Sequence, residues 1–209
     1  MSKKKNENKD LQFNVITIGD SGVGKTSIIR KYIHNIFDED SLATIGLNFA
    51  FKPVILKNGI EIKLKLIDTA GQEKYKSLAK TYYKNGHGVL FVFDYNDLAS
   101  FENMSEWIKL FEESNGNMNI PKYLVGNKSD LENKITEEKI NKFLNEVKFK
   151  FKRTSALTGA NIDELFQEIA EDIFKVFLNS GGKMQNNKLV KNYKPPKQKS
   201  NCICAIQSG

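Results

Sequence analysis

Residues 19–27 read GDSGVGKTS and come directly after the apolar run Phe13–Ile18. Two glycines enclose four residues, and a lysine and a threonine follow the second glycine, which is the G-x-x-x-x-G-K-[ST] pattern of a phosphate-binding loop. Glycines allow successive backbone N–H groups to point inward around a polyphosphate. A chance glycine-rich turn is the alternative, but the position between a strand pattern and a helix pattern favours a phosphate site.

Two residues of this loop carry side chains suited to a nucleotide and its metal ion. Lys25 would place a positive charge beside the β- and γ-phosphates, and Thr26 would offer a hydroxyl oxygen to Mg²⁺. The helix that follows would direct its positive end to the same anion. The residues that we expect to contact the phosphates are Ser21, Gly22, Val23, Gly24, Lys25, Thr26 and Ser27.

The net charge of +7 is concentrated at the two ends of the chain. Residues 1–10 hold four lysines and two acidic residues, and residues 180–209 hold six lysines and no acidic residue. The part between them is therefore close to neutral, whereas a nucleic-acid-binding domain would carry positive charge on its fold. The basic end favours an acidic membrane surface as partner and does not favour nucleic acid.

Strand-like and helix-like patterns alternate along the 209 residues. The Asn58-Gly59 pair between two apolar runs predicts a β-hairpin. We expect an α/β, doubly wound domain with a six-stranded, mostly parallel sheet, one antiparallel edge strand and about five helices. The predicted strands are 13–18, 47–56, 60–67, 89–93, 123–125 and 148–154, and the predicted helices are 24–36, 72–85, 100–114, 136–147 and 161–178.

The composition divides the chain into three parts. Residues 1–10 are polar and predicted to be disordered, and residues 11–178 hold the periodic patterns of a single domain. Residues 179–209 lose this periodicity and turn to Gly, Asn, Lys, Gln and Pro, which predicts a disordered basic tail. No apolar run approaches the roughly 18 residues of a membrane span.

The stretch GNKSD at 126–130 follows a predicted strand and can select a base. The carboxylate of Asp130 could accept the ring N–H and the exocyclic amino group of guanine, a pair of donors that adenine does not present. Asn127 could bond the N7 edge of guanine, and Lys128 could lie along the ring. A polar turn after a strand is the alternative for these residue types.

Two more stretches follow predicted strands, Thr-Ser-Ala at 154–156 and DTAGQE at 68–73. In the first, Ser155 is expected in the base site and the N–H of Ala156 could bond guanine O6. In the second, Asp68 could hold a Mg²⁺-bound water, Gly71 could donate its N–H to a γ-phosphate and Gln72 could orient an attacking water. A strand-to-helix turn capped by the aspartate is the alternative. Ligands bind at the carboxyl ends of strands in such sheets, so these motifs are expected to converge on one edge.

In this order and spacing, the motifs of residues 11–178 resemble those of P-loop small GTPases of the Ras superfamily. Within it the sequence is similar to the Rab GTPases. The Rab-like stretches are IGLNF at 45–49, KLKLI at 63–67, KYKSL at 74–78, YYKNG at 82–86, FVFDYN at 91–96 and SFENMSEW at 100–107.

The resemblance implies further roles. Thr44 would bind Mg²⁺ through its hydroxyl and the γ-phosphate through its N–H, and Phe37 would pack against the guanine ring. The reaction would be the slow hydrolysis of GTP to GDP and phosphate, with Lys25, Thr44 and Gln72 as its catalytic residues. Residues 38–49 and 68–83 would be two switches, ordered by γ-phosphate and Mg²⁺, that bind effectors when GTP is present.

The resemblance also implies regulators. The chain holds two arginines, Arg30 and Arg153, and neither lies in a switch, so an activating protein would supply an arginine finger. An exchange factor and a GDP-dissociation inhibitor or escort protein would complete the cycle. Ile67 departs from the family, since Rab proteins usually carry Trp there in an aromatic cluster with residues matching Phe49 and one of Tyr82 and Tyr83. The single tryptophan, Trp107, is expected in a helix away from the switches.

The chain ends in CICAIQSG, in which Cys202 and Cys204 match the C-x-C spacing of Rab tails. Two prenyl chains on these cysteines would give stable anchoring where one is marginal. Five residues follow Cys204, so the CAIQ stretch is not a terminal C-a-a-X box. Two exposed thiols are the alternative. The resemblance places the protein on the cytoplasmic face of an intracellular membrane, cycling with the cytosol, as a switch in vesicle trafficking.

Three other functions fit parts of the sequence. A divergent Ras-like signalling GTPase would share the nucleotide motifs. A guanine-nucleotide-binding module with little turnover would share the fold, but Lys25, Thr26, Thr44, Asp68 and Gln72 are all present. A P-loop kinase or ATPase is opposed by the GNKSD stretch.

Overall fold

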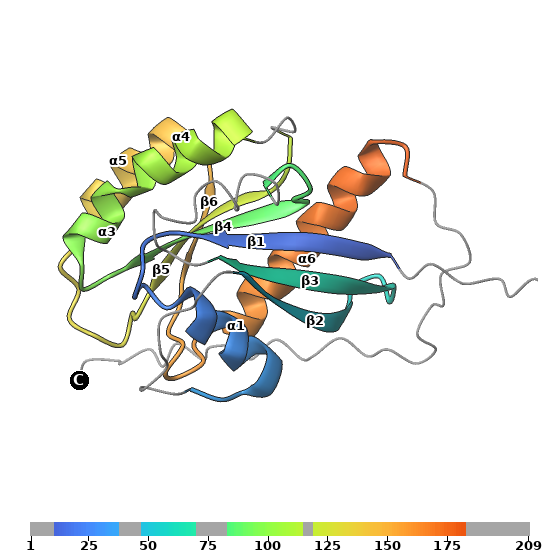
Figure 1. The fold of residues 1–209 in the computed structure, drawn as a ribbon, viewed down its shortest axis with the longest axis horizontal. Helices are drawn as coiled ribbons and strands as arrows, with labels where there is room; N and C mark the ends of the chain where they lie inside the picture. The colour runs from blue at the N-terminus through green and yellow to red at the C-terminus, as the bar shows by residue number, and fades with distance from the viewer. Residues whose placement is uncertain (1–10, 38–46, 70–82, 115–118, 183–209) are drawn as a thin grey trace, which may run out of the picture.

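A computed structural model describes residues 11–37, 47–69, 83–114 and 119–182 of the chain (Figure 1). Its six strands form one sheet with the order β2-β3-β1-β4-β5-β6. Strand β2 runs antiparallel to β3, and the other neighbouring strands are parallel. The strands are β1 (Gln12–Ile18), β2 (Leu47–Ile55), β3 (Glu61–Thr69), β4 (Gly88–Asp94), β5 (Lys122–Asn127) and β6 (Lys150–Arg153).

Helices cover both faces of the sheet (Figure 1). Among the described residues they are α1 (Lys25–His34), α3 (Leu98–Glu102), α4 (Met104–Ser114), α5 (Glu137–Val147) and α6 (Ile162–Asn179). The predicted doubly wound α/β fold with one antiparallel edge strand is therefore confirmed. The helix predicted at 72–85 falls mainly on residues 70–82, which lie outside the described residues.

One predicted helix, 100–114, is wrong as a single element. The structure has two helices there, α3 and α4, with Asn103 between them. Helix α3 begins two residues earlier than predicted because the Asp97 carboxylate accepts the Ala99 N–H at 3.1 Å and caps it. The side chain of Asn103 donates instead to a residue 83 positions away, Asp20, a partner that helical periodicity does not reveal.

Successive side chains of a central strand point to opposite faces of the sheet and pack into two separate hydrophobic cores. Leu90 and Val92 of β4 pack with side chains of α1 and α6, whereas Phe91 and Phe93 pack with those of α3, α4 and α5. All seven residues of β4 are buried, as expected for a parallel strand covered on both faces. The apolar face predicted for the last helix lies in the first of these cores.

The hairpin between β2 and β3 forms where Asn58-Gly59 predicts it. Gly59 has φ +82° and its N–H donates to Leu56 O at 2.8 Å. The Asn58 side chain accepts the Ile60 N–H at 3.1 Å. This turn sets β2 antiparallel at the edge of the sheet.

The carboxyl ends of β1 and β3 are held together by two threonines. The Thr69 hydroxyl donates to Thr17 O at 2.6 Å, and the Thr17 hydroxyl donates to Ile67 O at 3.2 Å. Since β1 leads into the GDSGVGKTS loop and β3 ends beside Asp68, these bonds place the loop next to that carboxylate.

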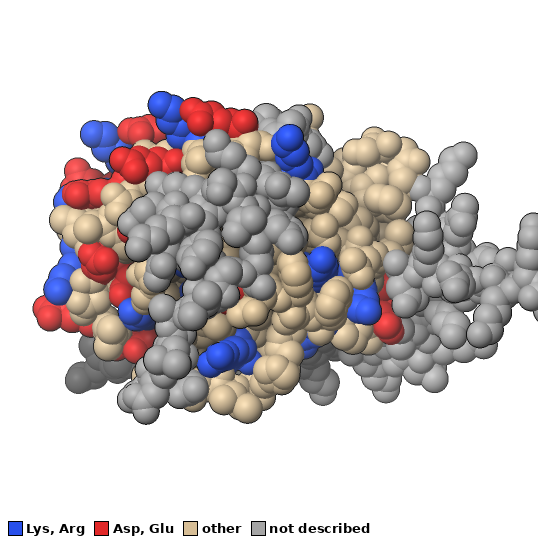
Figure 2. Space-filling model, viewed as in Figure 1, with Lys and Arg blue, Asp and Glu red and all other residues tan. Residues whose placement is uncertain are grey.

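Charged side chains are mixed on the face seen in Figure 2. Over α3, α4 and α5, acidic and basic side chains alternate, and other residues cover most of the described remainder of that face. Within the part of the chain that the structure describes, no helix combines the length and apolar character needed to cross a membrane.

Candidate nucleotide site

The loop between β1 and α1 adopts a backbone that only glycine accommodates at two positions. A Cβ at Gly19 would lie 2.1 Å from Val92 O, and one at Gly24 would lie 2.2 Å from Asn127 Nδ2. Gly24 also has φ +94°, in the left-handed region. Helix α1 then begins without a side-chain cap and without an acidic residue in its first turn, so its first N–H groups can receive an anion.

Lys25 lies inside this loop. Its side chain is buried, and Nζ donates to Gly19 O at 2.9 Å and to Asp20 O at 2.6 Å. Burial lowers the pKa of Lys25 to about 8, although the carboxylates of Asp68 and Asp20 act in the opposite direction. An anion bound in the loop would stabilise the charged form of this buried ammonium group.

Thr26 and Asp68 bring two oxygen ligands together. The Thr26 hydroxyl donates to Asp68 Oδ2 at 2.7 Å, and Asp68 is buried at the end of β3. Both residues line a hollow of about 120 Å³. A hydroxyl and a carboxylate are hard oxygen donors, and Mg²⁺ is usually held by few protein ligands together with waters and phosphates, so the pair fits this ion.

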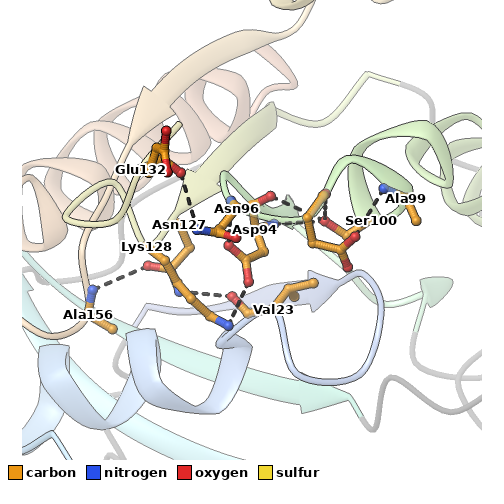
Figure 3. Close-up of polar contacts among 10 residues, drawn as sticks. Val23, Asp94, Asn96, Ala99, Ser100, Asn127, Lys128, Glu132 and Ala156 are labelled. Carbon is orange, nitrogen blue, oxygen red and sulfur yellow. Dashed lines mark hydrogen bonds and ion pairs between the residues drawn. The ribbon is translucent and has the colours of Figure 1, made fainter. Parts of the chain in front are cut away.

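Asn127, at the end of β5, ties three loops to one another (Figure 3). Its Nδ2 donates to Val23 O of the phosphate loop at 2.9 Å. Its Oδ1 accepts the Ala156 N–H at 3.2 Å and the Thr154 hydroxyl at 3.3 Å. Because Asn127 is buried, these bonds form away from water. The sequence suggests a base contact for Asn127, and the structure adds this role in holding the loops.

The other two residues of the base motif are positioned from different elements. Lys128 has φ +58° and forms an ion pair of 2.6 Å with Asp94 at the end of β4 (Figure 3). Asp130 accepts a hydrogen bond from the hydroxyl of Ser155, which is buried and also accepts the Thr158 N–H at 3.1 Å. Hydrogen bonds therefore join the stretches 126–130 and 154–156 into one side of the candidate base site.

The sequence alone does not identify Asp20 of the phosphate loop as a functional residue, nor the two residues that contact it. The Trp107 indole N–H donates to Asp20 Oδ1 at 2.6 Å, and the Asn103 amide donates to Asp20 Oδ2 at 2.8 Å. Asp20 in turn offers its carbonyl to Lys25. The available signals were an aspartate inside the glycine-rich loop and a tryptophan that is alone in the chain. The indole N–H of a buried tryptophan usually finds a hydrogen-bond acceptor, and an aspartate offers one.

Several predicted site residues lie outside the described residues. They are Thr44, Gly71, Gln72, Cys202 and Cys204, together with residues 38–46 and 70–82 of the two predicted switches. Phe37 is described: it is half-buried and packs against the core that contains α1 and α6. Ile67 is buried in the other core, while Phe49, paired with it across β2 and β3, stays 43% exposed.

A sequence model described as the Ras family matches residues 14–175. The chain belongs to the Ras family. Comparison with individual proteins indicates the branch of the family. The chain is 39% identical over 189 residues to the Ras-related protein Rab-13 of Bos taurus, covering 90% of this chain and 89% of that protein.

Two further relatives come from other organisms. The chain is 39% identical over 174 residues to the Ras-related protein Rab-5B of Plasmodium falciparum, with 83% of each chain covered. It is 37% identical over 172 residues to the GTP-binding protein ypt3 of Schizosaccharomyces pombe, covering 81% of this chain and 79% of that protein. The protein is thus a Rab-type small GTPase, which binds guanine nucleotides and hydrolyses GTP.

Proposed function

We propose that this Rab-type GTPase acts as a switch in vesicle trafficking, with its nucleotide bound along the carboxyl edge of the sheet. The observation that supports this most is the set of hydrogen bonds made by Asn127. They join the phosphate loop at Val23 to the loop at Ala156, so the phosphate and base motifs share one edge. A nucleotide is a ligand with a phosphate end and a base end that would span these two parts.

The base motif favours guanine. Asp130 is aimed by Ser155, and its carboxylate would accept the two N–H donors that guanine presents on one edge. Lys128, held by Asp94, would lie along the base, and Phe37 would pack on the ring. The Ala156 N–H would bond guanine O6, with Asn127 at the N7 edge.

The phosphate loop would hold the charged end. Its backbone from Ser21 to Ser27 and the Lys25 ammonium would surround the β- and γ-phosphates. Thr26 and Asp68, with Thr44, would hold Mg²⁺, which would neutralise charge on the transferring phosphate. Gly71 would contact the γ-phosphate, and Gln72 would orient the attacking water.

Neither arginine of the chain lies in a predicted switch, although Arg30 lines the same hollow as Thr26 and Asp68. Arg153 ends β6 and pairs with Glu137, and Arg30 lies in α1. An arginine finger from an activating protein would therefore supply the missing charge, worth about 10³–10⁵ in rate. An exchange factor would reopen the site, and effectors would bind residues 38–49 and 68–83.

Membrane association would come from the tail. Prenylation of Cys202 and Cys204 would insert two chains, and the six lysines of residues 180–209 would add attraction to an anionic leaflet. A GDP-dissociation inhibitor or escort protein would extract the lipids and return the protein to the cytosol.

Nucleotide content and phosphate release test the proposed function. We expect the purified chain to retain GDP or GTP and to release phosphate slowly with Mg²⁺. Gln72→Leu is expected to slow this release about tenfold or more, because the attacking water loses its orienting group. Gln12→Leu makes the same change at an exposed position at the start of β1 and should leave the rate unchanged.

Two outcomes would contradict the proposal. Bound ATP, or no bound nucleotide, would overturn the guanine assignment of Asp130. Bound guanine nucleotide without release from any variant, even with an activating protein, would make the chain a binding module.

The contact between Trp107 and Asp20 carries a separate prediction. Trp107→Phe keeps an aromatic ring in the core but removes the N–H that holds the phosphate loop. A hydrogen bond to a charged group contributes about 1.5–3 kcal/mol, so we expect GDP release to become about tenfold faster. Release would be followed with a fluorescent GDP analogue.

A double-mutant cycle separates this effect from general loosening. If Trp107 acts through Asp20, Trp107→Phe should add little to the release rate of Asp20→Ala. Fully additive effects would show that the indole N–H does not position the loop.

A further inference from the structure

A second hollow lies at the opposite pole of the domain from the phosphate loop. It occupies about 560 Å³ between the starts of β5 and β6 and the ends of α5 and α6. Figure 1 shows α6 running from the side of the phosphate loop to this far pole, where the chain leaves the domain. We name this hollow the basal pocket.

Lysines dominate the polar lining of the basal pocket, which includes Lys122, Lys148, Lys150 and Lys175. The one carboxylate in the lining is Asp172, which accepts the Tyr123 hydroxyl and Lys150 Nζ, each at 2.6 Å. Lys150 thereby neutralises Asp172. The remaining three lysines keep about three positive charges for the pocket.

The fold fixes the backbone of Lys148, and a ring contact places the ammonium group of Lys122. Lys148 has φ +59° and ends α5, its N–H donating to Leu144 O at 2.9 Å. Lys122 Nζ lies 5.5 Å from the centre of the Phe149 ring. Among the described residues, no carboxylate forms an ion pair with Lys122, Lys148 or Lys175. The pocket therefore presents cations around a space of ligand size.

The segment that follows α6 in the sequence is positively charged, as the basal pocket is. Helix α6 ends at Asn179, which lines the basal pocket. Residues 183–209 follow, with six lysines, no acidic residue and both cysteines. Because this segment begins where α6 ends, its lysines and those of the basal pocket could be attracted to the same anionic surface.

We propose that the basal pocket binds the phosphorylated headgroup of an anionic membrane lipid. Three lysines that line one hollow suit a headgroup with several phosphates better than a singly charged one. Binding there would turn the basal pole to the bilayer and keep the phosphate-loop edge facing away from it. This inference rests on the proposed association with membranes and adds to it a lipid class and an orientation.

The test uses the full chain, loaded with GDP and not prenylated, in a vesicle-binding assay. One set of vesicles contains phosphatidylcholine with phosphatidylinositol 4,5-bisphosphate. The other contains phosphatidylcholine with phosphatidylserine at the same total surface charge. The pocket variant combines Lys122→Gln, Lys148→Asn and Lys175→Gln, because asparagine tolerates the left-handed backbone at 148.

A matched control removes the same charge elsewhere. It combines Lys109→Gln, Lys139→Gln and Lys142→Gln, which are exposed positions of α4 and α5 outside the pocket. Both variants should keep the wild-type rate of GDP release, which shows that they fold. We expect the pocket variant to bind bisphosphate vesicles about tenfold more weakly than the control variant, with little difference on phosphatidylserine.

The other outcomes overturn the inference. Equal losses in the two variants would mean that only total charge matters. Equal affinity of the wild-type chain for both vesicles at matched charge would exclude a headgroup site. Soluble inositol trisphosphate binding as tightly as the vesicles would assign the pocket to a free metabolite. Failure of tail-driven membrane association would be seen separately, as absence of wild-type binding to phosphatidylserine vesicles.

Discussion

Replacing Lys25 with alanine is expected to lower the affinity for GDP and GTP by about 10²–10³-fold. The Lys25 ammonium is buried and held by Gly19 O and Asp20 O, so it already faces the space that the loop encloses. Removing one partner of a buried charge pair costs about 3–5 kcal/mol, since the phosphate would remain desolvated without its counter-charge. Titration with a fluorescent GDP analogue would measure this loss.

Lys31→Ala is the control for Lys25→Ala. It removes a lysine from the same helix, α1, at a position outside the phosphate loop. We expect its effect on affinity to be small. A loss of affinity in Lys25→Ala no larger than in this control would show that Lys25 serves only the loop backbone. A thermal unfolding curve for each variant would confirm that both are folded.

Asn127→Ala is expected to weaken both the fold and nucleotide binding. The change removes a donor to Val23 O and an acceptor for the Ala156 N–H, and both of those residues are buried. Each buried polar group left without its partner costs about 1–3 kcal/mol, so the two together should lower the free energy of unfolding of the nucleotide-free protein by about 2–6 kcal/mol. Urea unfolding would measure it.

Asn127→Ala is expected to weaken nucleotide binding in addition to the fold. Without Asn127, the phosphate loop and the side of the base site that holds Asp130 would have to be brought into register by the nucleotide itself. We expect GDP affinity to fall by about 10²-fold or more, since part of the binding energy is then spent on ordering the site.

Thr154→Val provides the matched comparison. It removes one bond to Asn127 Oδ1, of 3.3 Å, and leaves those to Val23 and Ala156 in place. Its cost should be about 1 kcal/mol. Asn127→Ala could instead lower the affinity for GDP and leave the stability of the nucleotide-free protein unchanged. That result would mean that Asn127 contacts only the base and does not hold the loops together.

Most strands could be predicted because their information is local. The continuous apolar run around Phe91 can only be buried, and the Asn58-Gly59 pair favours a tight turn whatever surrounds it. Helix ends were less predictable. Helix α1 ends at His34, two residues early, because Asn35 adopts φ +56° and donates its N–H to Lys31 O. Asparagine is compatible with that conformation but does not require it.

The site motifs were found for a similar reason. The conformation of the phosphate loop leaves no room for a side chain at positions 19 and 24. The two glycines in the sequence therefore indicate that conformation directly. The partners of Asp20 could not be found in this way. Its contacts with Asn103 and Trp107 cross more than 80 positions of sequence. No periodic pattern relates residues so far apart.

The fold class, the phosphate loop and the base motif can be inferred from the amino-acid sequence, because each depends on backbone conformation and side-chain chemistry within a few residues. Which distant groups meet is set by the three-dimensional fold: Asn127 contacts Val23, and Trp107 contacts Asp20. The fold also places four lysines around the basal pocket. These arrangements arise from the order of the strands and the packing of helices on both faces of the sheet. Hydrogen bonds and charges act over a few ångströms in space, regardless of separation along the chain.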